Sequence, residues 1–391
     1  MKIESVKAVK IKDSNGNDAI EIIINNKHRG SAPSGTSTGK HEVMAYPSKG
    51  VNQSINFVNK ILNKQLQKTN FETFEDLEEL ENELFEYDTT PNISKIGGNT
   101  IIALEYALLK GMFGRNHIYK GLSKSWKVPM PLGNIIGGGA HAKDSCDIQE
   151  FLLLPKAKSF SKAMNANRIA HEKIGNILKT KKDQENAWKI KASTEQILDL
   201  LTQVCEEVKD QTGVKISLGM DVAANSLYKS RRYYYKKFSR GHNAFSLSTK
   251  EQIEWINSLM ERYNLSYVED PLHEEDFRGF GELHEKAMVC GDDLICTNLD
   301  RLKKAKGKIN AVIVKPNQIG SLIETKKVID YAFKNKITPI LSHRAGETLD
   351  TTISHLAVAW KVPIVKFGID GEFREAKLNE IARIEHSIVK K

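Results

Sequence analysis

Three acidic residues and a lysine follow short apolar runs in the second half of the chain, and their types and order could hold a metal ion and move a proton. Asp221 ends KISLGMD, Glu269 lies in LSYVED, Asp292 lies in AMVCGDD and Lys315 ends AVIVK. Mg²⁺ prefers carboxylate oxygens and keeps coordination positions open for a substrate. Any one acid could instead cap the following helix, but three in succession, followed by a lysine, favour a cation site.

The cationic residues near this set suggest a base and an anionic substrate. A lysine buried beside a cation is disfavoured in its charged form, so we expect the pKa of Lys315 to fall and this residue to serve as a base. His343 and Arg344 follow TPILS, and Lys366 lies in VPIVKFG. These three could supply the positive charge that binds an anionic group.

The runs that carry these residues recur at the spacing of a repeated strand and helix. Their polar end residues are 48, 23, 23, 28 and 23 residues apart, close to one strand, one helix and two loops. A parallel αβ barrel brings the carboxyl ends of its strands to one face, where its active site lies. A doubly wound sheet would use fewer strand ends and normally contains a glycine-rich nucleotide turn. The pattern therefore predicts an α/β fold of the (β/α)8-barrel type.

Residues 1–122 lack this repeat and predict a smaller α+β domain. The segments Ile3 to Ile11 and Ala19 to Ile24 alternate around a turn of polar residues at 13–17, which is a hairpin signal. Helical periodicity follows at 50–66, 74–86 and 100–112. We expect an N-terminal capping domain, 1–122, and a barrel domain, 123–391, that contains the active site.

Two glycine-rich loops require separate interpretation. APSGTSTGKH is one residue short of a phosphate-binding loop and lacks its final Ser or Thr. It predicts a hydroxyl-rich loop that can close over a site, with Ser37 offering an oxygen to a metal. GGGAHA at 137–142 precedes a polar loop instead of a helix, so we do not assign it to dinucleotide binding.

Composition excludes several classes of protein. The chain has 391 residues, of which 40% are hydrophobic and 27% charged, so a disulfide mini-protein and a mainly disordered chain are excluded. No apolar stretch approaches the ~18 residues that cross a bilayer, and the N-terminus has no apolar signal segment. We therefore expect a cytoplasmic protein. Four cysteines without a CxxC pair fit a reducing compartment and predict neither a disulfide nor a zinc site.

The net charge of +9 could indicate a nucleic-acid partner. Basic residues are spread along the chain, however, and tyrosines interleave with them only at 231–237. Such a run more often forms a solvated loop with half-buried tyrosines than a stacking surface. We do not expect nucleic-acid binding.

Eight segments, in the same order along the chain, resemble the signature segments of the enolase family. They are APSGTSTGKHE, MPLGNIIGGGAHAKDSCDIQEFLLLP, GMDVAANSLY, YVEDPLHEEDF, GDDLICTN, KPNQIGSLIET, SHRAGETLDTTISHLAV and KLNEIARIE. The resemblance covers nearly the whole chain. It implies a modified (β/α)8 barrel with an N-terminal α+β cap, and a metal-dependent lyase of glycolysis and gluconeogenesis that interconverts 2-phosphoglycerate and phosphoenolpyruvate. It also implies two Mg²⁺ ions per site, a small phosphorylated acid as substrate, and a homodimer.

Carried over by motif position, the resemblance assigns roles to individual residues. The acids that bind the first Mg²⁺ match Asp221, Glu269 and Asp292; the serine that reaches the second matches Ser37; and the base that removes the C2 proton matches Lys315. The groups around the hydroxyl end of the substrate match His141, Gln149 and Glu150, and the cations that bind phosphate and carboxylate match Arg344 and Lys366. We count Lys315, Gln184, Glu150 and His343 as catalytic residues.

One departure from the family pattern bears directly on the reaction. The family's GDEGG segment carries the glutamate that assists loss of the C3 hydroxyl, and ungapped alignment puts Gln184 at that position. A neutral amide cannot donate a proton as a carboxylic acid does, and the neighbouring Glu185 could substitute only if the loop re-aims. Ala345 also replaces a serine after the phosphate-binding arginine.

Three functions therefore remain open. The first is a divergent phosphopyruvate hydratase with Glu185 or Glu150 as its acid, whose dehydration step the Gln184 replacement would impair. The second is a metal-dependent, enolate-forming enzyme on another phosphorylated or carboxylated acid. The third is a non-catalytic enolase-like protein that binds a ligand or a partner.

Overall fold

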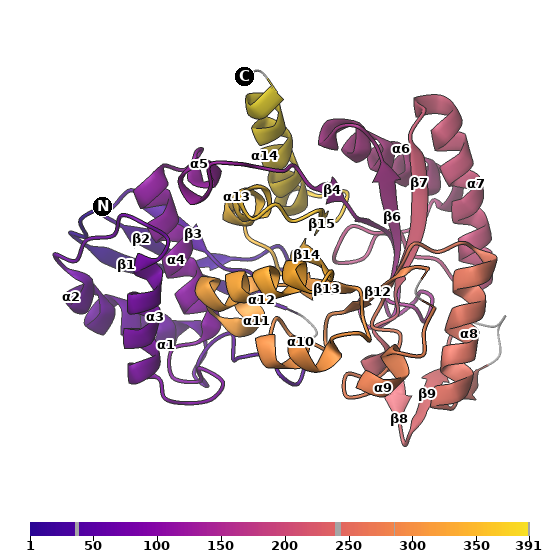
Figure 1. The fold of residues 1–391 in the computed structure, drawn as a ribbon, viewed down its shortest axis with the longest axis horizontal. Coiled ribbons are helices and arrows are strands. Elements are labelled where there is room, and N and C mark those ends of the chain that lie inside the picture. The colour runs from indigo at the N-terminus through magenta and orange to yellow at the C-terminus, as the bar shows by residue number, and fades with distance from the viewer. Residues whose placement is uncertain (36–38, 239–243, 285, 390–391) are drawn as a thin grey trace.

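The computed structural model describes residues 1–35, 39–238, 244–284 and 286–389 (Figure 1). The N-terminal elements gather at one side of the molecule, and the strands and helices that follow form a larger unit beside them.

The N-terminal unit is built on a three-stranded antiparallel sheet in the order β1-β2-β3. Its strands are β1 (Val6–Lys12), β2 (Asp18–Ile24) and β3 (His28–Ser31). The β1–β2 turn is closed by Asp13, whose Oδ1 accepts from the backbone N–H groups of Asn15 and Asn17 at 2.9 and 2.8 Å. The predicted hairpin is confirmed.

Helical segments complete the N-terminal unit. They are α1 (Val51–Phe57), a π-helical segment η1 (Val58–Leu62), α2 (Asn63–Leu66), α3 (Asp76–Tyr87), α4 (Gly98–Phe113) and α5 (Ile118–Leu122). The predicted helical segments lie within or overlap these elements. Helix α4 packs directly on β2 and β3, and a Cβ at Gly30 of β3 would lie 2.2 Å from the carbonyl oxygen of Ala103. Glycine is therefore required where strand and helix backbones approach this closely.

The larger unit is a nine-stranded sheet in the order β4-β15-β14-β13-β12-β11-β7-β6-β5. Its strands are β4 (Met130–Pro131), β5 (Gly133–Gly137), β6 (Glu150–Lys156), β7 (Lys215–Asp221), β11 (Tyr267–Glu269), β12 (Met288–Gly291), β13 (Ala311–Val314), β14 (Thr338–Ser342) and β15 (Ile364–Lys366). The edge strands β4 and β5 are separated only by Leu132, so the sheet is nearly closed on itself. Strand β6 runs antiparallel to β5 and β7, and the other pairs are parallel. This is the modified αβ barrel that the sequence predicted.

Helices surround the barrel, with a small hairpin sheet beside it (Figure 1). The helices are α6 (Phe160–Leu178), α7 (Thr194–Thr212), α8 (Thr249–Arg262), α9 (Phe277–Phe280), α10 (Leu299–Ala305), α11 (Pro316–Ile319), α12 (Leu322–Lys334), α13 (Thr352–Ala359) and α14 (Glu372–Val389), with the 3₁₀ turn η2 (Ala224–Ser226). The hairpin sheet contains β8 (Tyr228–Lys229), β9 (Arg232–Tyr235) and β10 (Phe245–Leu247). Tyr233 and Tyr235 are buried in it, which removes them from any exposed stacking surface.

Local chemistry explains where several of these helices begin. Ser193 and Ser248 form capping boxes with Gln196 and Glu251, and Asn298 accepts from two N–H groups at the start of α10. Such caps satisfy N–H groups that have no partner inside the helix. These three helices therefore start at defined residues.

The N-terminal unit is held over this mouth by contacts between the two units. Ser34 and Gly346 exchange backbone hydrogen bonds of 2.8 and 2.9 Å. Lys110 of α4 forms an ion pair with Asp350 at 2.5 Å, and both side chains are almost fully buried. Asn317 of α11 donates to the carbonyl oxygen of Pro33 at 2.9 Å. The bonds of Pro33 and Ser34 fix the start of the loop that follows them against the barrel.

None of the helices within the described part of the chain combines the length and apolar character that a membrane crossing requires.

Candidate active site

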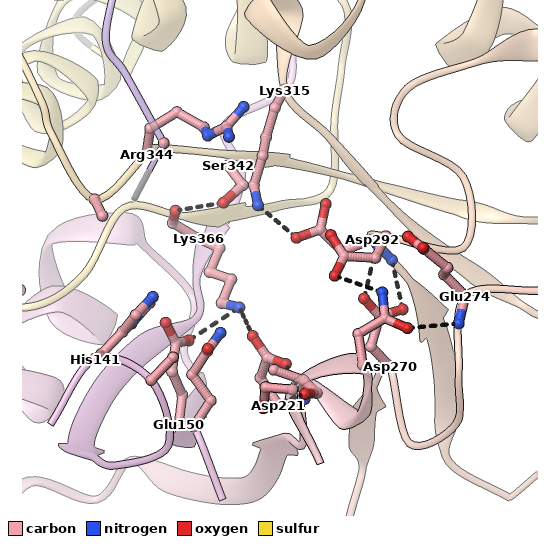
Figure 2. Close-up of a pocket in the computed structure, with 18 of the residues that line it drawn as sticks. His141, Glu150, Asp221, Asp270, Glu274, Asp292, Lys315, Ser342, Arg344 and Lys366 are labelled. Carbon is pink, nitrogen blue, oxygen red and sulfur yellow. Dashed lines mark hydrogen bonds and ion pairs between the residues drawn. The ribbon is translucent and has the colours of Figure 1, made fainter. Parts of the chain in front are cut away.

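A cavity of about 470 Å³ opens where the barrel strands end (Figure 2). Most of its polar lining comes from residues at or just after these strand ends. The lining includes Gly35, Lys40, His141, Gln149, Glu150, Glu185, Asp221, Asn225, Asp270, Glu274, Asp292, Asp293, Lys315, Ser342, His343, Arg344, Ala345 and Lys366. The cavity therefore brings together most of the residues that the sequence singled out.

Lys366 stands among acids at the centre of the site. Its Nζ lies 2.9 Å from Asp221 Oδ2, 2.7 Å from Glu269 Oε2 and 2.9 Å from Glu150 Oε2. Burial alone would lower the pKa of Lys366, but these three carboxylates outweigh it and hold the pKa well above its ordinary value. The sequence singled out Lys366 as a cation for the substrate, and in the structure its ammonium also neutralises the acids.

The first group of expected metal ligands lies on adjacent strands. Asp221 and Glu269 are register partners on β7 and β11. Burial, followed by the charge of Asp221, raises the pKa of Glu269 to about 8. Within the described residues, Glu269 Oε1 is buried without a hydrogen-bond partner. A divalent cation would favour the ionised form of this carboxyl and give that oxygen a partner, so these residues fit such an ion.

Asp292 lies beside two further acids, Asp270 and Asp293, that the sequence analysis did not single out. The N–H groups of Asp292 and Asp293 donate to Asp270 at 3.0 and 2.7 Å. Single oxygens of these three carboxylates lie within 4.8 Å of one another, and the cluster could hold a metal ion. Both missed acids are adjacent to predicted ones, in VED and GDD. Adjacency to a predicted acid was the sequence signal that could have identified them.

Lys315 forms an ion pair with Asp292 in the cavity. Its Nζ is 2.5 Å from Asp292 Oδ2, and its backbone N–H donates to Thr297 Oγ1 at 2.9 Å. Burial lowers the pKa of Lys315, as the sequence argument expected, but the Asp292 carboxylate opposes this effect and the net shift is upward. The expected fall in pKa is therefore not found among the protein groups alone, because the nearest charge is an anion instead of a cation.

Two further carboxyl groups, those of Glu185 and Glu150, line the other side of the cavity. Glu185 lies beside two histidines. Glu185 Oε1 is 3.6 Å from His141 Nδ1, and its Oε2 is 3.4 Å from His343 Nε2. Burial would raise the pKa of Glu185, but the two imidazoles hold it well below its ordinary value. Burial raises the pKa of the neighbouring Glu150 well above its ordinary value, although Lys366 opposes this effect. Groups with pKa values pushed apart in this way are typical of acid–base sites.

Glu185, and not Gln184, lines the cavity, which corrects the position taken from ungapped alignment. Asp183 Oδ1 accepts from the N–H groups of Glu185 and Ala187 at 2.8 and 3.0 Å and closes a tight turn. Asn186 adopts the left-handed region at φ 62°. This turn aims Glu185 inward, while Gln184 offers its carbonyl oxygen to Arg374 at 3.4 Å.

The remaining predicted residues lie where the N-terminal loop meets the barrel. Arg344 is buried and donates to Glu42 Oε2 and Oε1 at 2.9 and 3.2 Å, and to Asn317 at 3.1 Å. Gln149 and Ala345 line the cavity. Ser37 lies outside the described residues. Glu42 is a further missed residue, for which its position in the GKHE segment beside Ser37 was the only signal.

Together, the fold and the cavity define a capped αβ-barrel protein whose site combines buried carboxylates with lysines at the strand ends. Residues 3–115 match the family model described as the enolase N-terminal domain, and residues 125–391 match the one described as the enolase C-terminal TIM barrel domain. These matches cover both units.

Curated relatives match along the whole chain. The enolase of Methanothermobacter thermautotrophicus is 39% identical over 99% of this chain and 97% of its own length. The enolase of Methanosphaera stadtmanae is 40% identical with the same coverage, and that of Archaeoglobus fulgidus is 39% identical over 98% of this chain and 97% of its own length. The chain belongs to the enolase family.

Proposed function

We propose that the protein is a Mg²⁺-dependent enolase that interconverts 2-phosphoglycerate and phosphoenolpyruvate. The observation that carries the proposal is the position of Lys315 beside Asp292, with Glu150 and Glu185 across the same cavity. A base and an acid on opposite sides of a bound substrate are what an elimination of water requires.

The proposed reaction uses these groups in two steps. Lys315, in its neutral form, takes the C2 proton, and the electron pair of the C–H bond moves into the adjacent carboxylate. The electrons then return to form the C2–C3 double bond, the C3–O bond breaks, and a proton from the Glu150–Glu185 pair converts the departing hydroxide into water. Because Glu150 has the raised pKa, it holds the transferable proton, and Glu185 with His141 orients the leaving hydroxyl. His343 is proposed to support Glu185 from behind.

Two Mg²⁺ ions would be held by Asp221, Glu269 and Asp292, with Ser37 reaching the second. When bound, they supply the positive charge that stabilises the dianionic intermediate. Their charge would also lower the pKa of Lys315 by displacing the effect of Asp292. Lys366 and Arg344 are the proposed contacts for the carboxylate and phosphate groups of the substrate, and Gln149 is proposed to lie at its hydroxyl end.

We infer that dehydration is not impaired by the amide at position 184. Glu185 supplies a carboxylate inside the cavity, so the acid side of the site keeps its chemistry. This inference replaces the impaired enzyme considered from the sequence.

We also propose that residues 1–122 act as the capping domain, residues 123–391 as the catalytic barrel, and that two copies associate as a homodimer. All four cysteines are free and buried, which supports a cytoplasmic location. Light scattering at micromolar concentration should return about twice the monomer mass of 44.0 kDa.

The test is to follow phosphoenolpyruvate by its ultraviolet absorbance with 2-phosphoglycerate, in Mg²⁺ and in chelator, while NMR follows exchange of the C2 proton with D₂O. We expect both processes with Mg²⁺ and neither with chelator. Exchange of the C2 proton without formation of phosphoenolpyruvate would show that dehydration is impaired. Absence of both despite substrate binding would favour the non-catalytic alternative, and absence of binding would point to another acid as the substrate.

A further inference from the structure

His141 lines the cavity. Its side chain is 6% exposed and its Nδ1 lies 3.6 Å from Glu185 Oε1. Among the described residues, neither ring nitrogen has a hydrogen-bond partner. The position of the ring therefore depends on the backbone that carries it. We call this segment, residues 138–147, the His141 loop.

The base of the His141 loop is tied firmly to the barrel. Ser145 Oγ donates to the carbonyl oxygen of Gly137 at 2.6 Å and accepts from the N–H of Ile190 at 3.0 Å. Gly138 N–H donates to the carbonyl oxygen of Gln149 at 2.9 Å. Two backbone hydrogen bonds also hold the tip, residues 139–142: the N–H of Gly139 donates to Cys146 at 2.9 Å and that of Ala142 to Gly138 at 3.0 Å. Gly139 has a left-handed backbone at φ 50°.

Lys237 adds hydrogen bonds from outside the loop to the carbonyl groups of the tip. Its Nζ donates to the carbonyl oxygens of Gly139 and Ala142, both at 3.0 Å. These two carbonyls flank His141 on either side. An ammonium group has three donors and can bridge two acceptors at once, and hydrogen bonds from a charged donor are stronger than neutral ones.

Asp147, at the end of the same loop, fixes Lys237 in return. Its carboxylate accepts from the backbone N–H groups of Lys236, Lys237 and Phe238 at 3.0 to 3.1 Å. Asp147 therefore holds the segment that follows β9. From this segment the side chain of Lys237 reaches the tip of the His141 loop. The two residues form a reciprocal clamp between the hairpin and the His141 loop.

Lys237 does not itself line the active cavity. It lines an adjoining cavity of about 430 Å³, which shares Ala140, Ser226 and Tyr228 with the active one. Its effect on the chemistry must therefore pass through the loop.

We propose that Lys237, fixed by Asp147, is a positioning residue that holds the His141 loop so that His141 faces Glu185. The kinetic part of this inference rests on the proposed function, and the structural part does not. Small misplacements of a group that orients a substrate are costly, because an error of about 1 Å can lower a rate ~10²-fold.

The structural part is tested by hydrogen–deuterium exchange of the ligand-free protein, read on peptides that cover 138–147. We expect Lys237→Met, which keeps the apolar stem but removes the donors, to raise exchange at the loop tip several-fold. Lys237→Arg should restore most of the protection, since a guanidinium can also donate to two carbonyls. The matched control is Lys229→Met, at an exposed position of β8, which should leave the loop unchanged. Unchanged exchange at the tip in Lys237→Met would overturn the clamp.

The kinetic part is tested by a double-mutant cycle with His141→Ala. We expect Lys237→Met to lower kcat/KM for 2-phosphoglycerate about 10-fold in the wild-type background and less than twofold when His141 is already alanine. Effects that multiply in the double variant would refute action through His141. If the wild type does not turn over 2-phosphoglycerate, the proposed function fails, while the exchange result still decides the clamp.

A second variant guards against loss of folding. Asp147→Asn keeps the shape of the side chain but weakens its acceptance of three N–H groups, and it should raise exchange at the tip less than Lys237→Met does. A melting temperature within a few degrees of the wild type shows that the barrel is intact. Protection equal to the wild type in this variant would remove Asp147 from the proposal.

Discussion

The metal side and the proton-donor side of the cavity are built in different ways. Asp221 and Glu269 end the neighbouring strands β7 and β11, Lys366 ends β15 of the same sheet, and the sheet register sets their positions. Glu185 and His141 lie on loops, whose aim depends on side-chain hydrogen bonds such as those of Asp183. The hydrogen bonds of the whole sheet fix the position of a residue at a strand end, whereas a few local bonds fix the position of a loop residue.

This difference predicts how each side responds to change. On the metal side a substitution removes charge but leaves the scaffold in place, because the backbone is paired on both sides. On the proton-donor side a substitution outside the cavity can re-aim a residue within it. Four predictions test this contrast.

The largest effect is expected on the strand-built side. Lys315→Ala removes the proposed base, and both C2 exchange and phosphoenolpyruvate formation should fall ~10³-fold or more. NMR and ultraviolet absorbance measure the two in one sample. Lys326→Ala, at a partly exposed lysine of α12, is the control and should retain full activity. Exchange that persists in Lys315→Ala would assign the base elsewhere.

On the loop-built side, Glu185→Gln should slow dehydration ~10²-fold, because the site loses a carboxylate beside the leaving hydroxyl. Exchange at C2 should fall less, since Lys315 is untouched. Gln184→Ala should change either rate by less than about twofold, because Gln184 is not among the residues that line the cavity and its backbone carbonyl oxygen, which accepts from Arg374, is kept. The reverse ranking of the two variants would show that the turn is aimed differently in solution.

Mg²⁺ should stabilise the fold through the strand-end acids. A ligand that binds only the native state raises the melting temperature, and acids that repel one another gain most from it. We expect a shift of several degrees with excess Mg²⁺ relative to chelator, and a clearly smaller one in Glu269→Gln. Asp330→Asn, an exposed acid of α12, should keep the full shift. Equal shifts in all three proteins would exclude this site.

The smallest effect concerns the turn that aims Glu185. Burial, followed by the charge of Glu185, raises the pKa of Asp183 from 3.8 to about 6. Since the folded state binds this proton more tightly than the unfolded chain, the stability it contributes is present below pH 3.8 and is lost as the pH rises through about 6. Asp183→Asn should lack this part of the pH dependence.

The measurement is urea unfolding of both proteins at several pH values between 3.5 and 7. We expect the difference in free energy of unfolding to move in favour of Asp183→Asn as the pH rises. A constant difference would mean that the Asp183 carboxyl is not buried as described.

Much of the scaffold and of the metal side followed from the sequence alone. The spacing of the βα units and the polar residue at each strand end predicted the barrel and brought Asp221, Asp292 and Lys315 to one mouth. The reason is that parallel strands align their carboxyl ends, so position along the chain determines position in space. The hairpin and helices of the N-terminal unit were predicted for a similar local reason, since periodicity and turn residues act over short distances.

The tertiary structure alone decided which groups meet between elements. The turn closed by Asp183 put Glu185, in place of Gln184, into the cavity. The packing of the cap brought Glu42 onto Arg344, and Asp292, not a cation, was found beside Lys315. These contacts depend on where loops and domains settle against one another, and pairs as distant as Glu42 and Arg344 leave no periodic signal in the sequence.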